Sequence, residues 1–232
     1  MNVTRYEFLL QAGFFPVIQK QMNTRIDLKT TAEAEFNSRL FEKLDMQDEE
    51  FREKEFYNCN FVQCNFQRAN LSHAVFKDCK FVKCDLSMAK IENTVFQDLL
   101  IEQSKMVGVD WTIAGLHRKS KLNNRISIVG SDISFSFFTN CNLNGAIFTE
   151  CKAKEVDFSE ADLVYAKLLG CDFDGATFYK TNLTNADLTY ATNYRINICD
   201  NKVTNAKFSF PEVLNLLKPQ HIVIHDFDRD CS

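Results

Sequence analysis

The sequence predicts a solenoid, a chain wound into stacked turns. From residue 51 to residue 116, every fifth residue is large and apolar. The residue two positions earlier is usually small, and the residue between them is usually polar. A period of five fits neither the face of a helix, which returns every 3.6 residues, nor that of a strand, which returns every two. Repetition of this kind is typical of a fold in which each turn buries its apolar residues by stacking on its neighbours.

We expect the large and small residues to point inward and the other three of each unit to point outward. The large residues are Phe51, Phe56, Phe61, Phe66, Leu71, Phe76, Phe81, Leu86, Ile91, Phe96, Ile101, Met106, Trp111 and Leu116. The small ones are Cys59, Cys64, Ala69, Ala74, Cys79, Cys84, Ala89, Thr94, Ser104, Val109 and Ala114. Phe36, Phe41 and Met46 continue the frame backwards, but the residues between them match poorly. The first turn is therefore expected to begin between residues 40 and 51.

A second run with the same period follows. Its large positions are Ile128, Ile133, Phe138, Leu143, Phe148, Ala153, Phe158, Leu163, Leu168, Phe173, Phe178, Leu183, Leu188, Asn193, Ile198, Val203 and Phe208. Only Ala153 and Asn193 are not large and apolar. We expect the last regular turn to distort at Asn193.

Residues 1–40 precede the clear repeat and are expected to form a short helical extension. Thr4 and Glu7 have the spacing of a capping box and are followed by Phe8, Leu9 and Leu10. The open end of a solenoid exposes apolar residues and unpaired backbone groups, so a cap or lid is one interpretation of this segment. A partner-binding or membrane-surface segment is the other.

The frame breaks between the two runs, over residues 117–127. This stretch is polar, and its charged residues are Arg118, Lys119, Lys121 and Arg125. We expect a loop that projects from the side of the solenoid, either as a tolerated surface insertion or as a contact loop for a partner.

Residues 210–232 leave the repeat again. Pro211 begins a predicted short helix. Its apolar residues are more numerous than one narrow helix face requires, and they are Val213, Leu214, Leu216 and Leu217. Residues 222–224 are predicted to form a strand, and the acidic residues 226–232 a frayed tail.

Composition excludes several classes of protein. The chain has 232 residues and a net charge of −4, with 22 phenylalanines but only 7 glycines and 3 prolines, so a disordered or collagen-like chain is not expected. There is no apolar run of the roughly 20 residues that a membrane span needs, and no secretion signal is expected.

Seven of the nine cysteines fall in the small inward position: Cys59, Cys64, Cys79, Cys84, Cys141, Cys151 and Cys171. Packing in a reducing cytoplasm is therefore favoured over a disulfide or metal role.

Motifs that carry chemistry are missing from the sequence. It has no glycine-rich phosphate loop, nucleophile elbow or cysteine–histidine arrangement beyond chance. His221 and His225 bracket the predicted strand and could share one of its faces, which leaves a metal site open as a minor alternative. We expect no catalytic, cofactor-binding or metal residues.

The repeat resembles that of the pentapeptide-repeat family, A-(D/N)-L-x-x, over roughly residues 41–210. Ala161-Asp162-Leu163 and Ala186-Asp187-Leu188 match it most closely. The resemblance implies an all-β solenoid, a right-handed quadrilateral β-helix in which four repeats make one coil. Residues 41–116 and 128–209 would be its two halves, of about eight coils in all, and Cys59 would stack on Cys79, Cys64 on Cys84 and Cys151 on Cys171.

Two stretches are similar to the topoisomerase-protecting branch of that family, which includes Qnr-type quinolone-resistance proteins and a microcin immunity protein. One is Cys84-Asp85-Leu86-Ser87-Met88-Ala89, and the other is the C-terminal module from Asn193 to residue 224. The resemblance implies a homodimer joined through the C-terminal helix. It also implies mimicry of duplex DNA toward DNA gyrase or another topoisomerase, and protection of that enzyme from quinolone- or toxin-type inhibitors.

Charge supports such mimicry only in a restricted form. Duplex DNA carries one charge per ~1.7 Å, so a rod of roughly 40 Å would need about 24 negative charges. A uniform match therefore fails, and only an acidic stripe could mimic phosphates. With four repeats per coil, Asp132, Glu155, Asp172 and Asp174 share a face, diluted by Lys152 and Lys154. Ordinary solvated surface is the alternative, and direct nucleic-acid binding is not expected from one short basic loop.

These observations lead to one functional hypothesis and one alternative. The hypothesis is a cytoplasmic, homodimeric, non-enzymatic binding protein that engages DNA gyrase or a related topoisomerase. The alternative is a structural or scaffold module with an unrelated partner.

Overall fold

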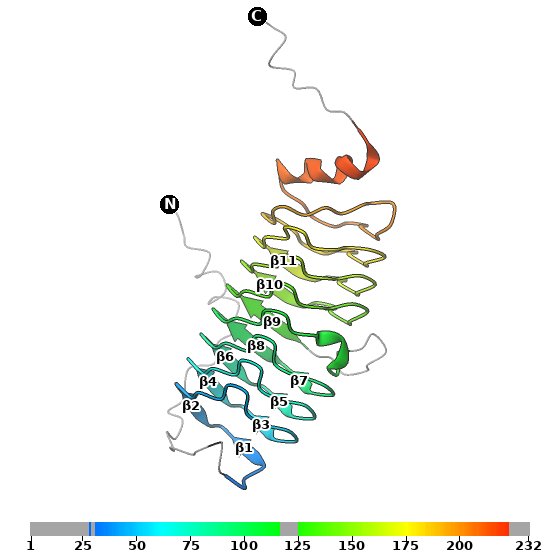
Figure 1. Ribbon diagram of the computed structural model, residues 1–232. Helices are drawn as coiled ribbons and strands as arrows, with labels where there is room; N and C mark the ends of the chain where they lie inside the picture. The colour runs from blue at the N-terminus through cyan, green and yellow to red at the C-terminus, as the bar shows by residue number, and fades with distance from the viewer. Residues whose placement is uncertain (1–27, 29–30, 117–124, 223–232) are drawn as a thin grey trace, which may run out of the picture.

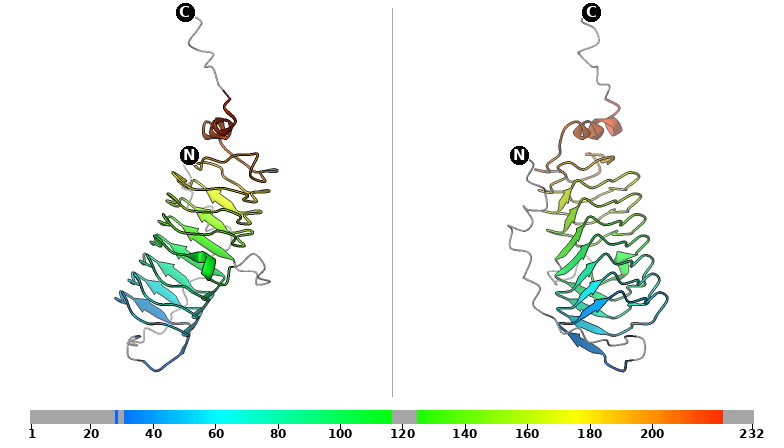
Figure 2. Two further views of the ribbon diagram at one scale, coloured as in Figure 1. Left: turned by 45° about the vertical axis from the view of Figure 1, so that its right-hand side comes forward. Right: turned by 90° about the vertical axis from the view of Figure 1, so that its left-hand side faces the viewer.

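The protein is an elongated parallel β-solenoid, as the sequence predicts (Figures 1 and 2). The computed structural model describes residue 28, residues 31–116 and residues 125–222. The helices predicted within residues 1–27 and the strand predicted at residues 222–224 lie wholly or largely outside these ranges. Ile222, the one residue of that strand inside them, is not in a strand.

Short strands form two parallel sheets on two sides of the rod (Figure 1). The four-stranded sheet contains β1 (Glu35–Asn37), β3 (Glu55–Tyr57), β5 (Val75–Lys77) and β7 (Val95–Gln97). The seven-stranded sheet contains β2 (Leu40–Glu42), β4 (Asn60–Val62), β6 (Lys80–Val82), β8 (Leu99–Glu102), β9 (Ile126–Val129), β10 (Ile147–Thr149) and β11 (Lys167–Leu169). Two 3₁₀ helices, η1 (Trp111–Ile113) and η2 (Glu212–Gln220), complete the elements of the described residues.

The corners between the sides are turned by residues in the left-handed region. Most of them are not glycine, and the φ angles of the non-glycine residues run from 48° at Gln103 to 62° at Tyr190. Such angles are unfavourable for residues with a Cβ atom. Many corners are held by a hydrogen bond to the next turn: the Asn58 N–H donates to the Lys77 carbonyl at 2.9 Å, and the Asp78 N–H to the Gln97 carbonyl at 2.9 Å. Stacking thus offsets the strain that every turn introduces.

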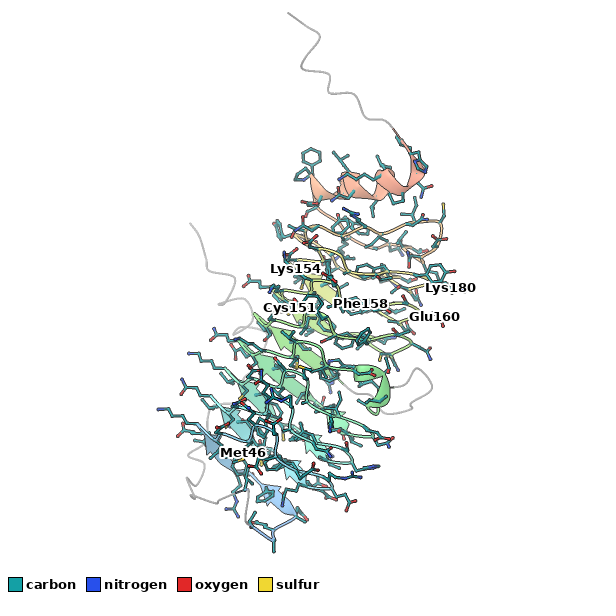
Figure 3. All side chains as sticks on the ribbon, viewed as in Figure 1. Met46, Cys151, Lys154, Phe158, Glu160 and Lys180 are labelled. Atoms are coloured by element: carbon teal, nitrogen blue, oxygen red, sulfur yellow. The ribbon has the colours of Figure 1, made fainter. Side chains whose placement is uncertain are left out.

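Aromatic rings stack along the interior, because equivalent residues recur at the same place in each turn. Phe56 and Phe76 lie 4.9 Å apart with nearly parallel rings, and Phe61 and Phe81 lie 4.6 Å apart. Neighbouring stacks meet edge to face, as Phe76 and Phe81 do at 5.4 Å. Met46, Cys151 and Phe158 lie inside the coil, whereas Lys154, Glu160 and Lys180 lie on its outside (Figure 3). The interior is therefore filled by side chains.

The small inward position has a second role that the sequence does not reveal. Each of the seven cysteines there has its Sγ 3.3–3.6 Å from a backbone carbonyl oxygen of the preceding turn. Thr94 and Thr181 donate to equivalent carbonyl oxygens at 2.8 Å. The described cysteines are free thiols, and burial raises the pKa of Cys79 and brings that of Cys141 to about 12. Cys79 and Cys141 thus pack as protonated thiols and donate hydrogen bonds at once.

The first turn begins earlier than expected. Phe36 in β1 is fully buried and stacks on Phe56 at 5.0 Å, and β2 pairs with β4. Leu28 is also buried in the core. The large residues at five-residue spacing are enough to start the coil although the small positions between them match poorly.

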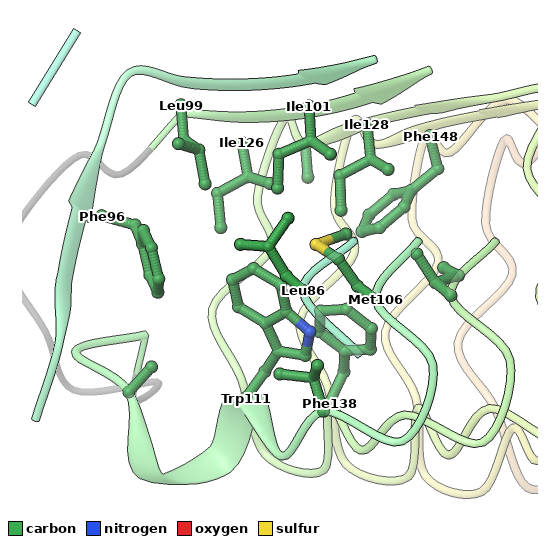
Figure 4. Packing of buried hydrophobic residues seen from close by; sticks show 14 of the residues in the cluster. Leu86, Phe96, Leu99, Ile101, Met106, Trp111, Ile126, Ile128, Phe138 and Phe148 are labelled. Carbon is green, nitrogen blue, oxygen red and sulfur yellow. The ribbon is translucent and has the colours of Figure 1, made fainter. Parts of the chain in front are cut away.

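One insertion interrupts the regular winding. Phe81 pairs with Ile101, one regular coil later. At the same spacing Ile101 would pair with Lys121, but it pairs with Ile128. The additional residues lie in the sequence between η1 and β9, and Trp111 of η1 stacks on Phe138 at 5.4 Å (Figure 4). Strand β9 begins at Ile126, so residues 126 and 127 belong to the sheet and not, as predicted, to the loop.

The last turn is distorted, as predicted at Asn193. Asn193 is exposed with a φ of 58°, and Tyr194 and Ile196 are buried instead. Ile198, predicted to point inward, is 39% exposed. The inward position moves by one residue, from Asn193 to Tyr194. The next position of the predicted frame, Ile198, therefore points outward.

Candidate functional site

Candidate sites lie on the outside of this filled coil. Within the described ranges, no group of three or more His, Cys, Asp or Glu side chains is arranged to bind a metal ion. Nor does that part of the chain contain a helix with the length and apolarity needed to cross a membrane. The predicted sites are the acidic face, the inserted loop and the C-terminal cap.

Asp132, Asp172 and Asp174 of the predicted acidic face each contact a lysine. Lys152 Nζ lies 2.9 Å from Asp132 Oδ2. Lys154 Nζ lies between two carboxylates, 3.3 Å from Asp174 and 3.6 Å from Asp172. Asp172 also accepts a hydrogen bond from the Asn193 amide at 2.7 Å. The fourth acid, Glu155, occupies an exposed corner.

One row of residues explains this pairing. We call it the Asp/Lys row, and successive β-bridges connect its members, Asp45, Asn65, Asp85, Lys105, Asp132, Lys152, Asp172 and Thr192. Neighbours in such a row are about 4.8 Å apart, so adjacent like charges would repel. Acids and bases therefore alternate in its second half. The face is a mixed row and not the continuous acidic stripe that phosphate mimicry needs.

The local hydrogen bonds also affect ionisation. Burial acts to raise the pKa of Asp132, but hydrogen bonds from Ser134 and Lys152 outweigh it and hold that pKa below its ordinary value. The hydrogen bond to Asp174, helped by the charge of Asp172, raises the pKa of Lys154. Both groups are therefore charged at neutral pH.

Replacing Asp132 with asparagine tests this pairing. A carboxyl whose pKa is lowered by folding stabilises the protein above its ordinary pKa, and this contribution disappears as pH falls through the lowered value. We expect Asp132→Asn to cost about 0.5–1 kcal/mol at pH 7 and almost nothing near pH 2, measured by urea unfolding. In a double-mutant cycle with Lys152→Met, the coupling should disappear over the same range. A coupling independent of pH would contradict the ion pair.

Only the end of the predicted contact loop is described. Arg118, Lys119 and Lys121 lie outside the described residues. Arg125 is exposed, and its Nε lies 3.1 Å from Asp98 Oδ1, while its carbonyl oxygen accepts from the Leu99 N–H at 2.9 Å. Arg125 thus contacts the neighbouring turn through both its side chain and its backbone.

Helix η2 lies across the C-terminal end of the rod (Figure 1). Leu216 packs against the core. At the C-terminal end of the helix, the Gln220 amide donates to Asn197 at 2.7 Å and the Cys199 thiol to Gln220 at 3.5 Å. The helix is longer than predicted and of the 3₁₀ type, in which residues three apart eclipse each other.

The cap leaves apolar side chains in solvent. Phe210 is 79% exposed, Ile222 52% and Leu214 37%, and no residue of η2 is fully buried. Val213, Leu216 and Leu217 are half-buried. Only part of the predicted apolar set is therefore used to close the coil.

An apolar corner midway along the rod was not predicted from the sequence. Met88 is 60% exposed, and Phe135 and Phe137 are 48% and 49% exposed. All three occupy outward repeat positions: Met88 and Phe135 lie at corners, and Phe137 lies on the adjoining side. That position in the five-residue frame is the signal that could have identified them.

Comparison with known families and structures agrees with the fold. The model of the pentapeptide repeat region matches residues 49–132, and that of pentapeptide repeats in eight copies matches residues 127–163 and 157–191. No curated protein matches the chain.

Solved structures show similar repeats at low identity. A trypsin-treated form of QnrB1, a plasmid-mediated fluoroquinolone resistance protein, is 22% identical with a TM-score of 0.47, over 82% of this chain and 100% of that one. HetL, a pentapeptide repeat protein involved in heterocyst differentiation regulation in the cyanobacterium Nostoc, is 15% identical with a TM-score of 0.43, over 89% and 92% of the two chains.

Proposed function

Because this chain belongs to the pentapeptide-repeat family, we propose that it is a non-enzymatic binding protein that acts through the outside of its coil. The partner we propose is a DNA topoisomerase, with DNA gyrase as the first choice. Binding at the DNA-binding surface of the enzyme would protect it from quinolone- or toxin-type inhibitors.

The filled interior is the observation that carries this proposal. Large residues such as Phe61, Phe138 and Phe158 are fully buried and stacked, so the inward apolar residues of the described coil fill its interior. Enzymes and small-molecule binders usually use a deep concave pocket. A rod of this kind instead offers a long, regular surface on which a partner's groove can close.

The stretch from Cys84 to Ala89 supports the choice of a topoisomerase. Asp85 lies in the Asp/Lys row, and Met88 is 60% exposed two positions beyond the inward Leu86. The stretch that resembles the topoisomerase-protecting branch therefore presents both charge and an apolar side chain outward. Together with the exposed Phe135 and Phe137, it offers a partner apolar as well as charged contacts on the outside of the coil.

Electrostatic complementarity would arise if basic residues of the bound protein replaced Lys152 and Lys154 as the ion-pair partners of the acidic face. Asp132, Asp172 and Asp174 already contact lysines of the same face. Exposed ion pairs of this kind contribute little to stability, so arginines or lysines of a partner can compete with Lys152 and Lys154 at low cost. Such exchange would favour specificity and association rate more than affinity.

The same pairing favours a second candidate function. A row of alternating acids and bases is typical of a solvated surface that stabilises the rod itself. A scaffold module with an unrelated partner would need no acidic stripe. The proposal therefore depends on an enzyme assay and not on charge alone.

A gyrase supercoiling assay with and without a fluoroquinolone tests the proposal. We expect micromolar protein to restore supercoiling in the presence of the drug. Arg118→Glu/Lys119→Glu/Lys121→Glu, which reverses the charge of the loop, should lose this protection. The matched control is Lys77→Glu/Lys80→Glu/Lys83→Glu, which changes charge equally on strands β5 and β6 and the turn that follows.

A second pair of variants tests the acidic face. Glu155→Gln/Asp174→Asn should weaken protection, whereas Glu160→Gln/Asp162→Asn, on a neighbouring side, should not. If micromolar wild-type protein neither inhibits gyrase nor protects it, the topoisomerase proposal is wrong and the scaffold function is favoured.

A further inference from the structure

The corner midway along the rod carries a continuous apolar surface. We define the apolar corner as Met88, Phe135 and Phe137, which are 60%, 48% and 49% exposed. Backbone hydrogen bonds connect the turns of Met88, Gly108 and Phe135 in that order. A Cβ atom at Gly108 would lie 3.6 Å from Met88 Cγ, so the methionine side chain lies over the bare glycine, in the direction of Phe135. Gly108 therefore adds no side chain that would separate the two.

Three carboxylates flank the phenylalanines. β-Bridges place Asp110 and Asp157 on either side of Phe137, in rows about 4.8 Å away. The bridges before and after Phe135 keep the same register, so Glu155 lies one turn beyond Phe135. Asp110 and Asp157 are half-buried, and Glu155 is exposed. Aromatic rings and carboxylates thus lie side by side on the outside of the coil.

These carboxylates retain capacity to bind a partner. Asp110 Oδ1 accepts from the Thr112 N–H at 2.9 Å, and Asp157 Oδ1 accepts from the Ser159 N–H at 2.8 Å. Both hydrogen bonds are local and use one oxygen of a group that can accept about four. Within the part of the chain that the structure describes, neither aspartate nor Glu155 forms an ion pair.

Two bases on the same side of the coil are held away from the apolar corner. Arg68 Nε lies 2.7 Å from Asp48 Oδ1, in the turn that precedes Arg68. Lys154 Nζ lies 3.3 Å from Asp174 Oδ2, in the turn that follows Lys154. Lys90, by contrast, is exposed two residues after the methionine. We therefore expect a bound cation at the phenylalanine end of the apolar corner.

We propose that the apolar corner binds arginine side chains of a protein partner. A guanidinium group stacks on aromatic rings and forms paired hydrogen bonds with carboxylates. Phe135 and Phe137 supply exposed rings, and the three carboxylates lie in the rows beside them. Met88 offers apolar surface to the aliphatic stem of an arginine. Charge complementarity thus identifies the occupant as a basic segment, and the rings favour arginine over lysine.

This site deepens the proposed function, because it assigns the partner's contact to one place on the outside of the coil. It rests on that function only for the partner being a protein. A DNA-binding surface is rich in arginine and lysine, so a topoisomerase would meet the requirement. Another protein with an exposed arginine segment would also meet it, and peptide binding is therefore measured separately from gyrase protection.

Titration of the full chain with peptides tests the site. The probes are hexa-arginine and hexalysine in salt of about 150 mM, which screens distant charges. The signal is the methyl resonance of Met88, labelled with carbon-13 and assigned with Met88→Leu. We expect hexa-arginine to shift this resonance and to bind at least about threefold more tightly than hexalysine. The resonances of Met46 and Met106, which are buried, should not move.

Phe135→Ala/Phe137→Ala should abolish the preference for arginine, because the rings needed for stacking are lost. The matched control is Tyr165→Ala/Tyr190→Ala, which removes two aromatic side chains that are 63% and 61% exposed at other corners. The control should keep the wild-type preference. A Met88 resonance that does not move, or equal binding of the two peptides by the wild type, would overturn the proposal.

A second pair of variants tests the carboxylates. Glu155→Gln/Asp157→Asn should weaken hexa-arginine binding at least about fivefold, whereas Glu160→Gln/Asp162→Asn should leave it unchanged. Equal weakening by both pairs would mean unspecific attraction and would also overturn the site. Gyrase protection without peptide binding would overturn this site alone, and peptide binding without protection would overturn only the topoisomerase proposal.

Discussion

Phe76→Ala is expected to lower the free energy of unfolding by about 3–5 kcal/mol. Phe76 is 1% exposed and stacks on Phe56 at 4.9 Å and on Phe96 at 5.6 Å. Its ring also meets Phe61 and Phe81 edge to face. Neighbouring rings are fixed by the hydrogen bonds of their own turns, so they cannot close the cavity that the substitution leaves. Urea unfolding followed by circular dichroism measures the change.

Tyr165→Ala is the control for this prediction. Tyr165 is also aromatic but is 63% exposed at a corner, with a φ of 57°. Its removal should change the free energy of unfolding by no more than about 0.5 kcal/mol. A Phe76→Ala protein as stable as wild type would mean that the stacked column does not carry the stability of the fold.

Leu214→Asp/Leu217→Asp is expected to convert a dimer into monomers. We propose that the C-terminal cap joins two copies end to end, because Phe210, Leu214 and Ile222 expose apolar surface at this end of the rod. Two carboxylates placed in such an interface would be buried without partners, which costs several kcal/mol. That cost corresponds to a loss of affinity of about 100-fold or more. Light scattering at micromolar concentration measures the mass.

The control variant carries the same charges at a different exposed site. Met88→Asp/Phe135→Asp replaces two apolar residues at the corner midway along the rod, which are 60% and 48% exposed. We expect it to remain dimeric. If the cap variant stays dimeric while the corner variant becomes monomeric, the interface lies along the side of the coil.

Most of the fold could be predicted because the inward positions repeat. A large residue every fifth position and a small one two before it predict which side chains are buried from Phe51 to Leu188, and this is confirmed. The prediction was wrong at the two ends of the coil, where a turn stacks on a neighbour on one side only. At the first turn Phe36 is already inside, and in the last turn Ile198 is outside.

The candidate site was predicted less well, because it consists of outward residues. A coil of four repeats brings Asp132, Asp172 and Asp174 to one face, but it does not show that Lys152 and Lys154 reach them. The exposed corner at Phe135 was missed for the same reason. Outward positions obey no strong pattern, since many residue types are tolerated there.

The sequence by itself determined the winding of this protein, the set of residues that fill its axis, and the place of its one insertion. Those features follow from burying apolar side chains at a fixed period, which is a local rule repeated along the chain. Only the tertiary structure decided which outward charges are neutralised, which apolar side chains remain uncovered, and where the coil begins and ends. These depend on contacts between residues on successive turns, such as Phe81 with Ile101 and Ile101 with Ile128, and on the last turns having a neighbour on one side only.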